Sequence, residues 1–588
     1  PLDRLAAQPT RAAGTASAPS APGAPRAPRV RKAGAPAPAA QPRAGDAAVG
    51  GELPLKHAPR PTTPAITAAD LMTRVYVFAD DSMLGREVGT VGNVRGNAYI
   101  ARELARLGLR PAGDSGSYFQ ALPLVRRGFD QQARLVVGPD TLRFGADFLA
   151  APARGTPRSI DGAAVVYGGE LAGGATLPIS AEQAAGKLVI VSVANLAALQ
   201  GGASPAALAG AAGVAIVVLD QLPAQFRGFF TRTQTVVDSA AYQAALEPMA
   251  PAGDTPLTLL VSRAAAERLL GAPLAGAAPG AAGRTVAGTV AFRTERAPAT
   301  NVVAVLPGRD PALGGQYVAL GAHNDHVGLD REVADHDSLR IVLTVTRPQG
   351  ADSPERPTTG EERARIRAML DSVRARRPAR PDSVYNGADD DASGSMALLE
   401  VAEAMVGARP RRSVLFVWHT GEEAGLYGSL HFTDHPTVPR DSIVAQLNVD
   451  MIGRGTAADL SGGGPGYVQL IGSRRLSTEL GDLVEAVNRA QRTPFTFDYQ
   501  YDANGHPQQY YCRSDHYAYA RYGIPVVFFS TGGHRDYHQL TDEPQYLDYA
   551  KYARVTQLLH DVARRVADRD ARPVVDKAKP DPRGQCVQ

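Results

Sequence analysis

The stretch that decides the fold is VLFVWHTGEEAGLYG, residues 414–428. Its β-branched and aromatic run breaks at Gly421, and two adjacent carboxylates, Glu422 and Glu423, follow. The run leaves no room for a helix of typical length, so we expect a buried strand. Neighbouring carboxylates repel each other when both are ionised, so a protein that holds them at a strand end supplies a cation or keeps one protonated. The alternative interpretation is a solvated acidic pair at a helix N-terminus.

Size and composition exclude several classes of protein. The chain has 588 residues, 44% hydrophobic and 21% charged, and can therefore bury a large core and divide into two or three units. Its formal net charge of +3, without a dense basic patch, argues against nucleic acid as a partner. Gly, Ser and Pro interrupt the apolar runs, so we expect no membrane span. Cys512 and Cys586 provide no disulfide framework and no thiolate metal site, although a disulfide between them stays open.

Changes in composition along the chain predict its domains. The expected units are an Ala/Pro-rich disordered arm at 1–64, the first part of a catalytic domain at 65–149, an inserted module at 150–283, the rest of the catalytic domain at 284–568 and a polar tail at 569–588. Within the catalytic domain, residues 330–384 form a polar, Arg-rich insertion with a helical centre, which we interpret as a surface helix or a flap beside the site. The chain begins without methionine, so we expect that an N-terminal segment was removed or never included.

Acids and imidazoles recur where predicted strands end. His323 follows an apolar run, as do Asp450 and His538 further along, and helical segments separate these runs. Three aspartates, with Asp390 in the middle, precede an amphipathic helix and exceed what N-capping requires. In a doubly wound sheet, ligands gather outside the carboxyl ends of the strands. We therefore expect an α/β fold with a doubly wound sheet on which these side chains converge.

This set of side chains has the chemistry of a metal site. Two histidines and several carboxylates, without cysteine, favour a borderline-to-hard divalent metal, and zinc best fits them. If one aspartate bridges, two histidines and two further acids suffice for a pair of ions, which can share a hydroxide. One glutamate of the adjacent pair then remains as a general base. His326 and His419 have no spacing that favours them as ligands, and His419 is interpreted as a packed core histidine.

In these motifs the chain resembles the M28 di-zinc aminopeptidases. The matching motifs, in the family's order, are HNDHVG at 323–328, GADDDASG at 387–394, GEEAGLYG at 421–428, NVDMIG at 448–453, SDH at 514–516 and DYH at 536–538 with the TDEP that follows. The resemblance implies a three-layer fold of the zinc-dependent exopeptidase type, with a mixed sheet between helices on both faces. It also implies that the inserted module is a mostly-β protease-associated (PA) domain.

The resemblance further implies a ligand set for two Zn²⁺ ions. His323 and Asp450 would bind one ion, Glu423 and His538 would bind the other, and Asp390 would bridge them.

Other roles follow from the same resemblance. Glu422 would be the general base, and Asp325 would orient the first histidine ligand. Tyr511 falls where some family members place an oxyanion-stabilising tyrosine, with the adjacent Tyr510 as the alternative. Those members carry a disulfide near the tyrosine, whereas Cys512 has no close partner along this sequence. Asp515 and His516 are candidates for a supporting layer behind the ligands.

The implied function is hydrolysis of peptide bonds at the N-terminus of peptide substrates, through a metal-bridging water that Glu422 deprotonates to the attacking hydroxide. On the same scaffold the alternatives are a carboxypeptidase releasing acidic residues and a single-zinc glutaminyl cyclase. A receptor-like binding protein that has lost catalysis is the alternative from another class. The apparently complete ligand set disfavours the last two. The family and the missing N-terminus imply a secreted, periplasmic or cell-surface protein.

Overall fold

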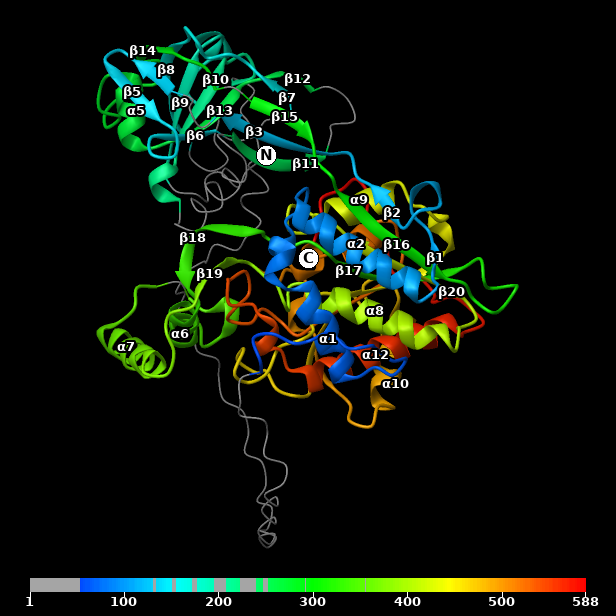
Figure 1. Cartoon of the computed structure of the whole chain (residues 1–588). Helices are drawn as coiled ribbons and strands as arrows, with labels where there is room; N and C mark the ends of the chain where they lie inside the picture. The colour runs from blue at the N-terminus through cyan, green and yellow to red at the C-terminus, as the bar shows by residue number, and fades with distance from the viewer. Residues whose placement is uncertain are drawn as a thin grey trace, which may run out of the picture.

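A mixed sheet of nine strands forms the centre of the molecule (Figure 1). This computed structural model describes residues 53–130, 134–150, 155–171, 177–194, 208–222, 240–246, 252–290, 292–354 and 356–588. Most of the expected arm at 1–64 therefore lies outside the described residues. In the part of the chain that is described, no helix combines the length and apolar character needed to cross a membrane.

The strand order places four parallel strands together. The sheet runs β1 (Arg110–Pro111), β16 (Thr300–Leu306), β20 (Ser413–His419), β17 (Tyr317–His323), β21 (Ile443–Val449), β24 (Val526–Ser530), β22 (Tyr467–Ile471) and β23 (Thr496–Asp498), with β2 (Phe119–Ala121) beside β16. Neighbours from β20 to β24 are parallel. The pairs of β16 with β1 and β20, and of β22 with β24, are antiparallel. This arrangement confirms the expected mixed α/β fold.

Helices cover both faces of this sheet. One face packs against α1 (Ala68–Phe78), α2 (Val91–Arg106), α8 (Ala392–Val406), α10 (Thr478–Arg489) and α12 (Tyr549–Ala567). The other face packs against α9 (Tyr427–Asp434) and α11 (His516–Ala520). Along β16, Val302 and Ala304 belong to the first core, whereas Val303 and Val305 belong to the second. Because side chains alternate across a strand, both faces need apolar residues, which explains the continuous apolar runs in the sequence.

A second sheet with its own core lies beside the first (Figure 1). Its eight strands run β5 (Asp140–Arg143), β4 (Arg134–Val137), β14 (Ala282–Ala287), β8 (Ala164–Leu171), β9 (Leu188–Val193), β10 (Gly213–Val217), β13 (Leu257–Val261) and β6 (Phe148–Ala150), with helices α3 (Ala181–Ala184) and α5 (Arg263–Leu270). Smaller pairings join β3 (Leu124–Asp130), β11 (Ala240–Leu246) and β15 (Phe292–Arg296), and β7 (Gly155–Pro157) with β12 (Ala252–Thr255). The sheet extends beyond the expected range 150–283 on both sides, because its outer strands β4 and β5 are short and only half apolar.

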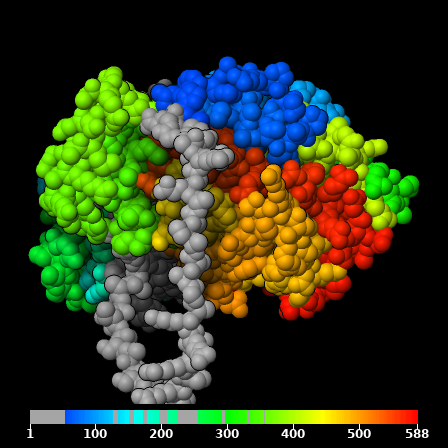
Figure 2. All heavy atoms as spheres, turned by 90° about the horizontal axis from the view of Figure 1, so that it is seen from below, coloured from blue at the N-terminus to red at the C-terminus, as the bar shows by residue number. Residues whose placement is uncertain are grey.

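The insertion at 330–384 folds as a separate lobe with the expected helical centre. It comprises β18 (Leu329–Asp335), α6 (His336–Thr346), α7 (Gly360–Arg374) and β19 (Pro381–Val384), and the two strands pair with each other. No residue of α7 is buried, so this helix lies on the surface, as its charge predicts. Figure 2 shows the lobe as a light-green mass at one side of the molecule.

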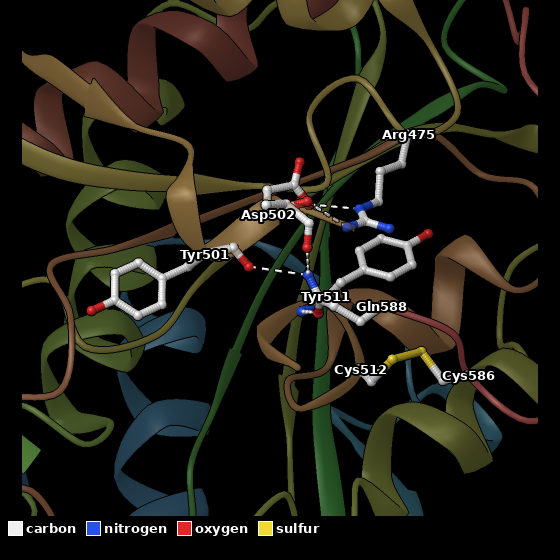
Figure 3. Close-up of a disulfide and its surroundings, with 8 residues drawn as sticks. Arg475, Tyr501, Asp502, Tyr511, Cys512, Cys586 and Gln588 are labelled. Carbon is white, nitrogen blue, oxygen red and sulfur yellow. Dashed lines mark hydrogen bonds and ion pairs between the residues drawn. A yellow bond between two sulfur atoms is a disulfide. The ribbon is translucent and has the colours of Figure 1, made fainter. Parts of the chain in front are cut away.

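The expected tail at 569–588 is held against the catalytic domain. Cys586 forms a disulfide with Cys512, which corrects the expectation that Cys512 has no close partner (Figure 3). The Gln588 side chain accepts a hydrogen bond from the Tyr511 amide at 2.9 Å and donates one to the Tyr501 carbonyl at 3.1 Å. The sequence did not predict this disulfide, because the two cysteines are 74 residues apart and their contact depends on the path of the last residues.

Candidate metal centre

The carboxyl ends of the parallel strands meet at one edge of the central sheet. β17 ends at His323, β21 ends one residue before Asp450, and β20 ends shortly before Glu422 and Glu423. Asp390 lies just before α8, which packs on the same sheet. The register of parallel strands therefore brings residues distant in sequence to a single edge, as the strand-end pattern predicts.

Asp390 lies between two groups of ligand-type side chains. Its Oδ1 is 3.1 Å from His323 Nε2, which is 3.7 Å from Asp450 Oδ1. On the other side, its Oδ2 is 3.0 Å from His538 Nε2, which is also 3.0 Å from Glu423 Oε2. All five residues of the expected ligand set thus lie together. The two oxygens of Asp390 point to different groups, which is the arrangement that a bridging carboxylate needs.

His326 also lies in this cluster, although its spacing gave no reason to select it. Its Nδ1 is 2.7 Å from Glu423 Oε1 and 3.8 Å from Asp390 Oδ2. Its ring is fully buried and lies edge-on to that of His538, with centroids 5.7 Å apart. The signal that would have found it is the segment HNDH, which places one imidazole at the end of the strand and a second three residues later.

Asp325 supports both His323 and Glu422. His323 Nδ1 lies 3.1 Å from the backbone carbonyl of Asp325 and 3.7 Å from its carboxylate. The carboxylate Oδ1 instead accepts a hydrogen bond from the Glu422 amide at 3.1 Å. The ring is therefore oriented by the backbone oxygen first, while the acid fixes the loop that carries the two glutamates.

The three consecutive aspartates point in different directions. Asp389 accepts a hydrogen bond from the Gly453 amide at 2.6 Å, beyond the end of β21. Asp391 accepts one from the Gly394 amide at 2.9 Å and one from the His323 amide at 3.1 Å. It therefore caps α8 and joins it to the end of β17. Only the middle aspartate faces both histidine groups, which explains why the run exceeds what capping requires.

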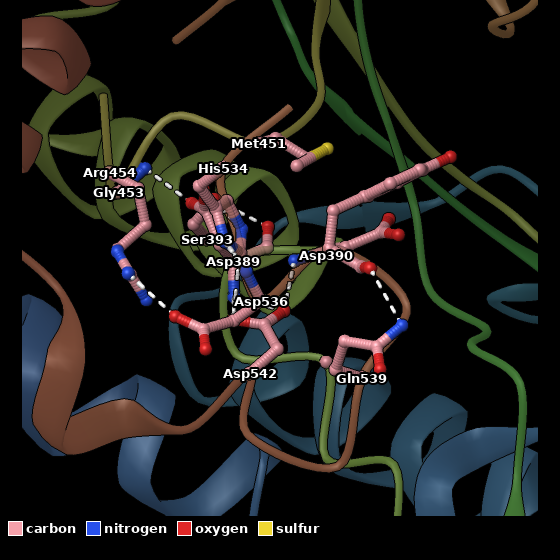
Figure 4. A network of polar contacts seen from close by, with 12 residues as sticks. Asp389, Asp390, Ser393, Met451, Gly453, Arg454, His534, Asp536, Gln539 and Asp542 are labelled. Carbon is pink, nitrogen blue, oxygen red and sulfur yellow. Dashed lines mark hydrogen bonds and ion pairs between the residues drawn. The ribbon is translucent and has the colours of Figure 1, made fainter. Parts of the chain in front are cut away.

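A buried network behind Asp390 joins its loop to the loop of His538 (Figure 4). Asp542 accepts hydrogen bonds from the Asp389 amide at 3.0 Å and from the Asp390 amide at 3.1 Å. Arg454 donates to Asp536 at 2.8 Å and is fully buried. Gly387 lies at the start of the same loop with φ of +52°, and a Cβ there would be 2.2 Å from the Asp390 carbonyl. The position therefore requires glycine.

The electrostatics of the cluster favour a bound cation. Burial raises the pKa of Glu422 well above its usual range, and Asp450 and Glu423 raise it further. Burial lowers the pKa of His538, but Glu423 and Asp390 outweigh this effect and raise it to about 10. His326 Nε2 is buried without a hydrogen-bond partner in the described part of the chain. Two groups of imidazole and carboxylate atoms, each within 4.8 Å of one another, therefore fit zinc-type ions.

Comparison with known proteins agrees with this geometry. Residues 301–563 match the model of Peptidase family M28. This segment is an M28 peptidase domain. A probable leucine aminopeptidase of Arthroderma otae is 35% identical over 105 residues, which are 17% of this chain and 29% of that protein. Leucine aminopeptidase 1 of Coccidioides posadasii is 33% identical over 153 residues, 24% of this chain and 36% of that protein.

The chain therefore spans about a third of the length of these relatives, 29% and 36%. Among solved structures, an aminopeptidase from Aneurinibacillus sp. strain AM-1 is similar at 15% identity, with a TM-score of 0.48, and the match covers 88% of this chain and 97% of that one.

Tyr511 packs in a hydrophobic core of the domain. Its side chain is 4% exposed and belongs to the core beneath α11, with the guanidinium of Arg475 4.3 Å from its ring centre. Its neighbour Tyr510 is closer to the acids, since Asp450 is among the groups that raise its pKa to about 12, after burial and Asp352. The expected role of Tyr511 therefore stays a prediction, with Tyr510 as its alternative.

A different tyrosine of the M28 domain adjoins the cluster. The ring of Tyr537 stacks on His538, with centroids 3.9 Å apart. Burial raises its pKa well above 10, and Asp390, Glu423 and Glu422 raise it further. Its hydroxyl accepts a long hydrogen bond from Arg513 at 3.5 Å. Sequence reasoning missed Tyr537, although it immediately precedes a predicted ligand.

The supporting residues lie where a layer behind the ligands is expected. His419 is fully buried, with Nδ1 3.3 Å from Asp515 and Nε2 3.0 Å from the Tyr519 hydroxyl. It is thus a packed core histidine, as interpreted. Ser514 donates to Asp450 Oδ2 at 2.8 Å and fixes the orientation of that carboxylate. His516 stacks on Phe528 and has no contact with the ligands among the described residues.

Proposed function

We propose that the protein is a zinc-dependent aminopeptidase that cleaves peptide bonds at the N-terminus of peptide substrates. The observation that carries the proposal is Asp390, whose two oxygens face two separate histidine–acid groups. Glu422 lies next to these groups and belongs to neither. The names of the relatives support an aminopeptidase over the carboxypeptidase and cyclase alternatives.

The proposed centre holds two ions in residues of this chain. His323 and Asp450 would hold one, and Glu423 with His538 would hold the other, with Asp390 between them. When bound, a zinc pair lowers the pKa of water toward neutrality and polarises a carbonyl group. An imidazole that binds a metal must be neutral. In the absence of metal the neighbouring acids stabilise protonated histidines, so zinc binding would release these protons. His326 is an additional candidate ligand for the second ion.

Glu422 would act as general base. Burial and neighbouring acids raise its pKa, and a carboxylate with a raised pKa can accept a proton at neutral pH and return it to the leaving amine. Its amide is fixed by Asp325, so the side chain is positioned from the same strand end as His323. Tyr537, rather than Tyr511, is the candidate donor to an oxyanion, because it stacks on a proposed ligand.

The test is the substitution Glu422→Gln, which keeps the shape of the side chain and removes the base. We expect turnover of leucine p-nitroanilide to fall by about 10²–10⁴-fold or more, since general-base catalysis contributes this range. Zinc content should stay near that of the wild type. His419→Gln is the control for changes in packing behind the centre. Full activity of Glu422→Gln would remove this residue from the role, and cleavage of N-acetylated peptides would contradict the N-terminal specificity.

We also propose that the second sheet is an insertion of the PA type and that the protein works outside the cytoplasm. The insertion is supported by its mostly-β composition and by its place between two parts of the catalytic domain. Location in an oxidising compartment is supported by the Cys512–Cys586 disulfide, since such bonds persist in secreted and periplasmic proteins.

A further inference from the structure

A third group of ligand-type side chains lies outside the M28 centre, where the insertion meets the loop after His538. His336 is the first residue of α6, Asp382 lies in β19, and Glu543 immediately precedes the short helix η10 (Pro544–Tyr546). One ligand atom from each lies within 4.8 Å of the others. We propose that His336, Asp382 and Glu543 bind a third divalent cation of the zinc class.

The charges at this place call for a cation. Neither Asp382 nor Glu543 forms an ion pair with an arginine or lysine among the described residues, and His336 is the only basic partner of Asp382 there. Arg380 pairs with Asp337 at 3.1 Å and also donates to the Tyr546 hydroxyl at 3.2 Å, and Arg340 pairs with Asp536 at 2.7 Å.

Burial of Glu543 points the same way. It raises the pKa of this residue to about 8, and Asp382 adds to the effect. Two acids that are held close together raise each other's pKa, and a bound cation relieves this repulsion.

The surroundings of His336 suit a ligating imidazole. The residue is 2% exposed, its Nδ1 is 2.8 Å from Asp382 Oδ2, and its Nε2 is 3.1 Å from the Tyr546 hydroxyl. A hydroxyl group can either donate or accept a hydrogen bond. With a cation bound at Nδ1, the proton sits on Nε2 and is donated to Tyr546, which fixes the tautomer as a supporting residue does at a zinc site.

The spacing resembles that in the M28 centre. There, His326 Nδ1 lies 2.7 Å from Glu423 Oε1, close to the 2.8 Å between His336 and Asp382. One histidine and two carboxylates form a ligand set that zinc accepts, with water completing the coordination. The alternative is a histidine that only hydrogen-bonds Asp382 and Tyr546.

A cation here would link the insertion to the loop of Asp390. Asn386 donates to Glu543 Oε1 at 3.1 Å and is followed by Gly387, the residue that needs a left-handed conformation. Asp542, the residue before Glu543, accepts hydrogen bonds from the amides of Asp389 and Asp390. The third ion would therefore join β19 and α6 to the segment that positions the bridging aspartate. This inference does not depend on the proposed activity.

The test is zinc stoichiometry of the purified full chain, measured by elemental analysis after equilibration with zinc and removal of the excess. We expect three zinc ions per chain in the wild type and two in Asp382→Asn/Glu543→Gln, because the amides keep the volume and lose the charge. The matched control is Glu361→Gln/Asp371→Asn on the exposed helix α7, which should keep three. His336→Gln serves as a second variant if the double substitution fails to fold, as judged by circular dichroism.

A further variant separates this site from the M28 centre. Asp390→Ala/Glu423→Gln should lose the pair and retain one zinc ion, which the added Asp382→Asn substitution should remove. Equal zinc content in the wild type and Asp382→Asn/Glu543→Gln would overturn the third site and leave the proposed peptidase intact. If Glu422→Gln retains three ions and loses activity, this result supports the third site and the role of Glu422 separately.

Discussion

Neighbouring residues of one motif have separate tasks in this protein. Of the three consecutive aspartates, Asp389 binds the Gly453 amide beyond β21 and Asp391 caps α8. Asp390 faces the two histidine groups. The resemblance to a family predicted the middle residue, Asp390. The other two roles, and the contact of His326, depend on side-chain directions that a sequence does not encode locally. Adjacent tyrosines differ in the same way, since the ring of Tyr511 packs against Arg475 and that of Tyr510 against Arg513.

His516 should make stability depend on pH. Its ring stacks on Phe528, with centroids 4.8 Å apart, and burial lowers its pKa to about 3. Between pH 6.5 and this value, the unfolded chain binds a proton that the folded chain excludes, so stability falls as the pH falls. Each pH unit below 6.5 costs the wild type about 1.4 kcal/mol of unfolding free energy. Between pH 7 and pH 5, the unfolding free energy of His516→Phe should therefore fall by about 2 kcal/mol less than that of the wild type.

Chemical unfolding at the two pH values measures this difference. His560→Gln, which removes a partly exposed histidine that pairs with Asp561, is the control. Equal losses in the wild type and His516→Phe would contradict the prediction.

At the scale of elements, the loop from η9 (Tyr510–Cys512) to α11 depends on the last residues of the chain. Cys586 is covalently joined to this loop, and Gln588 binds the amide of Tyr511. Three residues after Tyr511, Ser514 donates a hydrogen bond to Asp450. The sequence predicted the strands and the helix around this loop from their apolar periodicity. It did not predict the pairing, because the tail has no periodicity and its path is set by tertiary contacts.

Removing the disulfide should destabilise this loop. A crosslink between residues separated by 74 positions restricts the unfolded chain, and the chain-entropy model gives about 4 kcal/mol for such a loop. Thermal unfolding of the wild type should therefore shift to lower temperature in reducing buffer. The variant Cys512→Ser/Cys586→Ser should melt at that lower temperature with or without reductant. An unchanged wild-type midpoint on reduction would contradict this account.

At the scale of the whole molecule, the two large sheets were predictable to different degrees. The central sheet could be predicted because its strands are buried on both faces and read as apolar runs. The second sheet begins with short strands such as β4, whose alternating pattern is weaker, so its limits were set too narrowly. The insertion was recognised by its charge, whereas its contact with the loop of Glu543 follows only from the fold.

Zinc should stabilise the folded chain. Buried acids and imidazoles at the edge of the central sheet have few other partners, and an ion that binds only the folded state adds about 2.7 kcal/mol at a concentration of 100 times its Kd. The unfolding midpoint should therefore rise with zinc concentration and fall on treatment with a chelator. The shift should be smaller in Asp390→Asn. A midpoint that is insensitive to chelator would argue against bound zinc.

The order of the proposed ligands along the chain has a consequence for biosynthesis. The first, His323, lies in β17, and the last, His538, follows β24 near the end of the domain. While a ribosome is still making the segment after β21, the proposed second ion lacks one of its imidazoles and the sheet lacks a parallel strand. Nascent chains, and fragments that stop short of β24, are therefore expected to be inactive, because the proposed proteolytic activity would arise only once synthesis has passed the last proposed ligand.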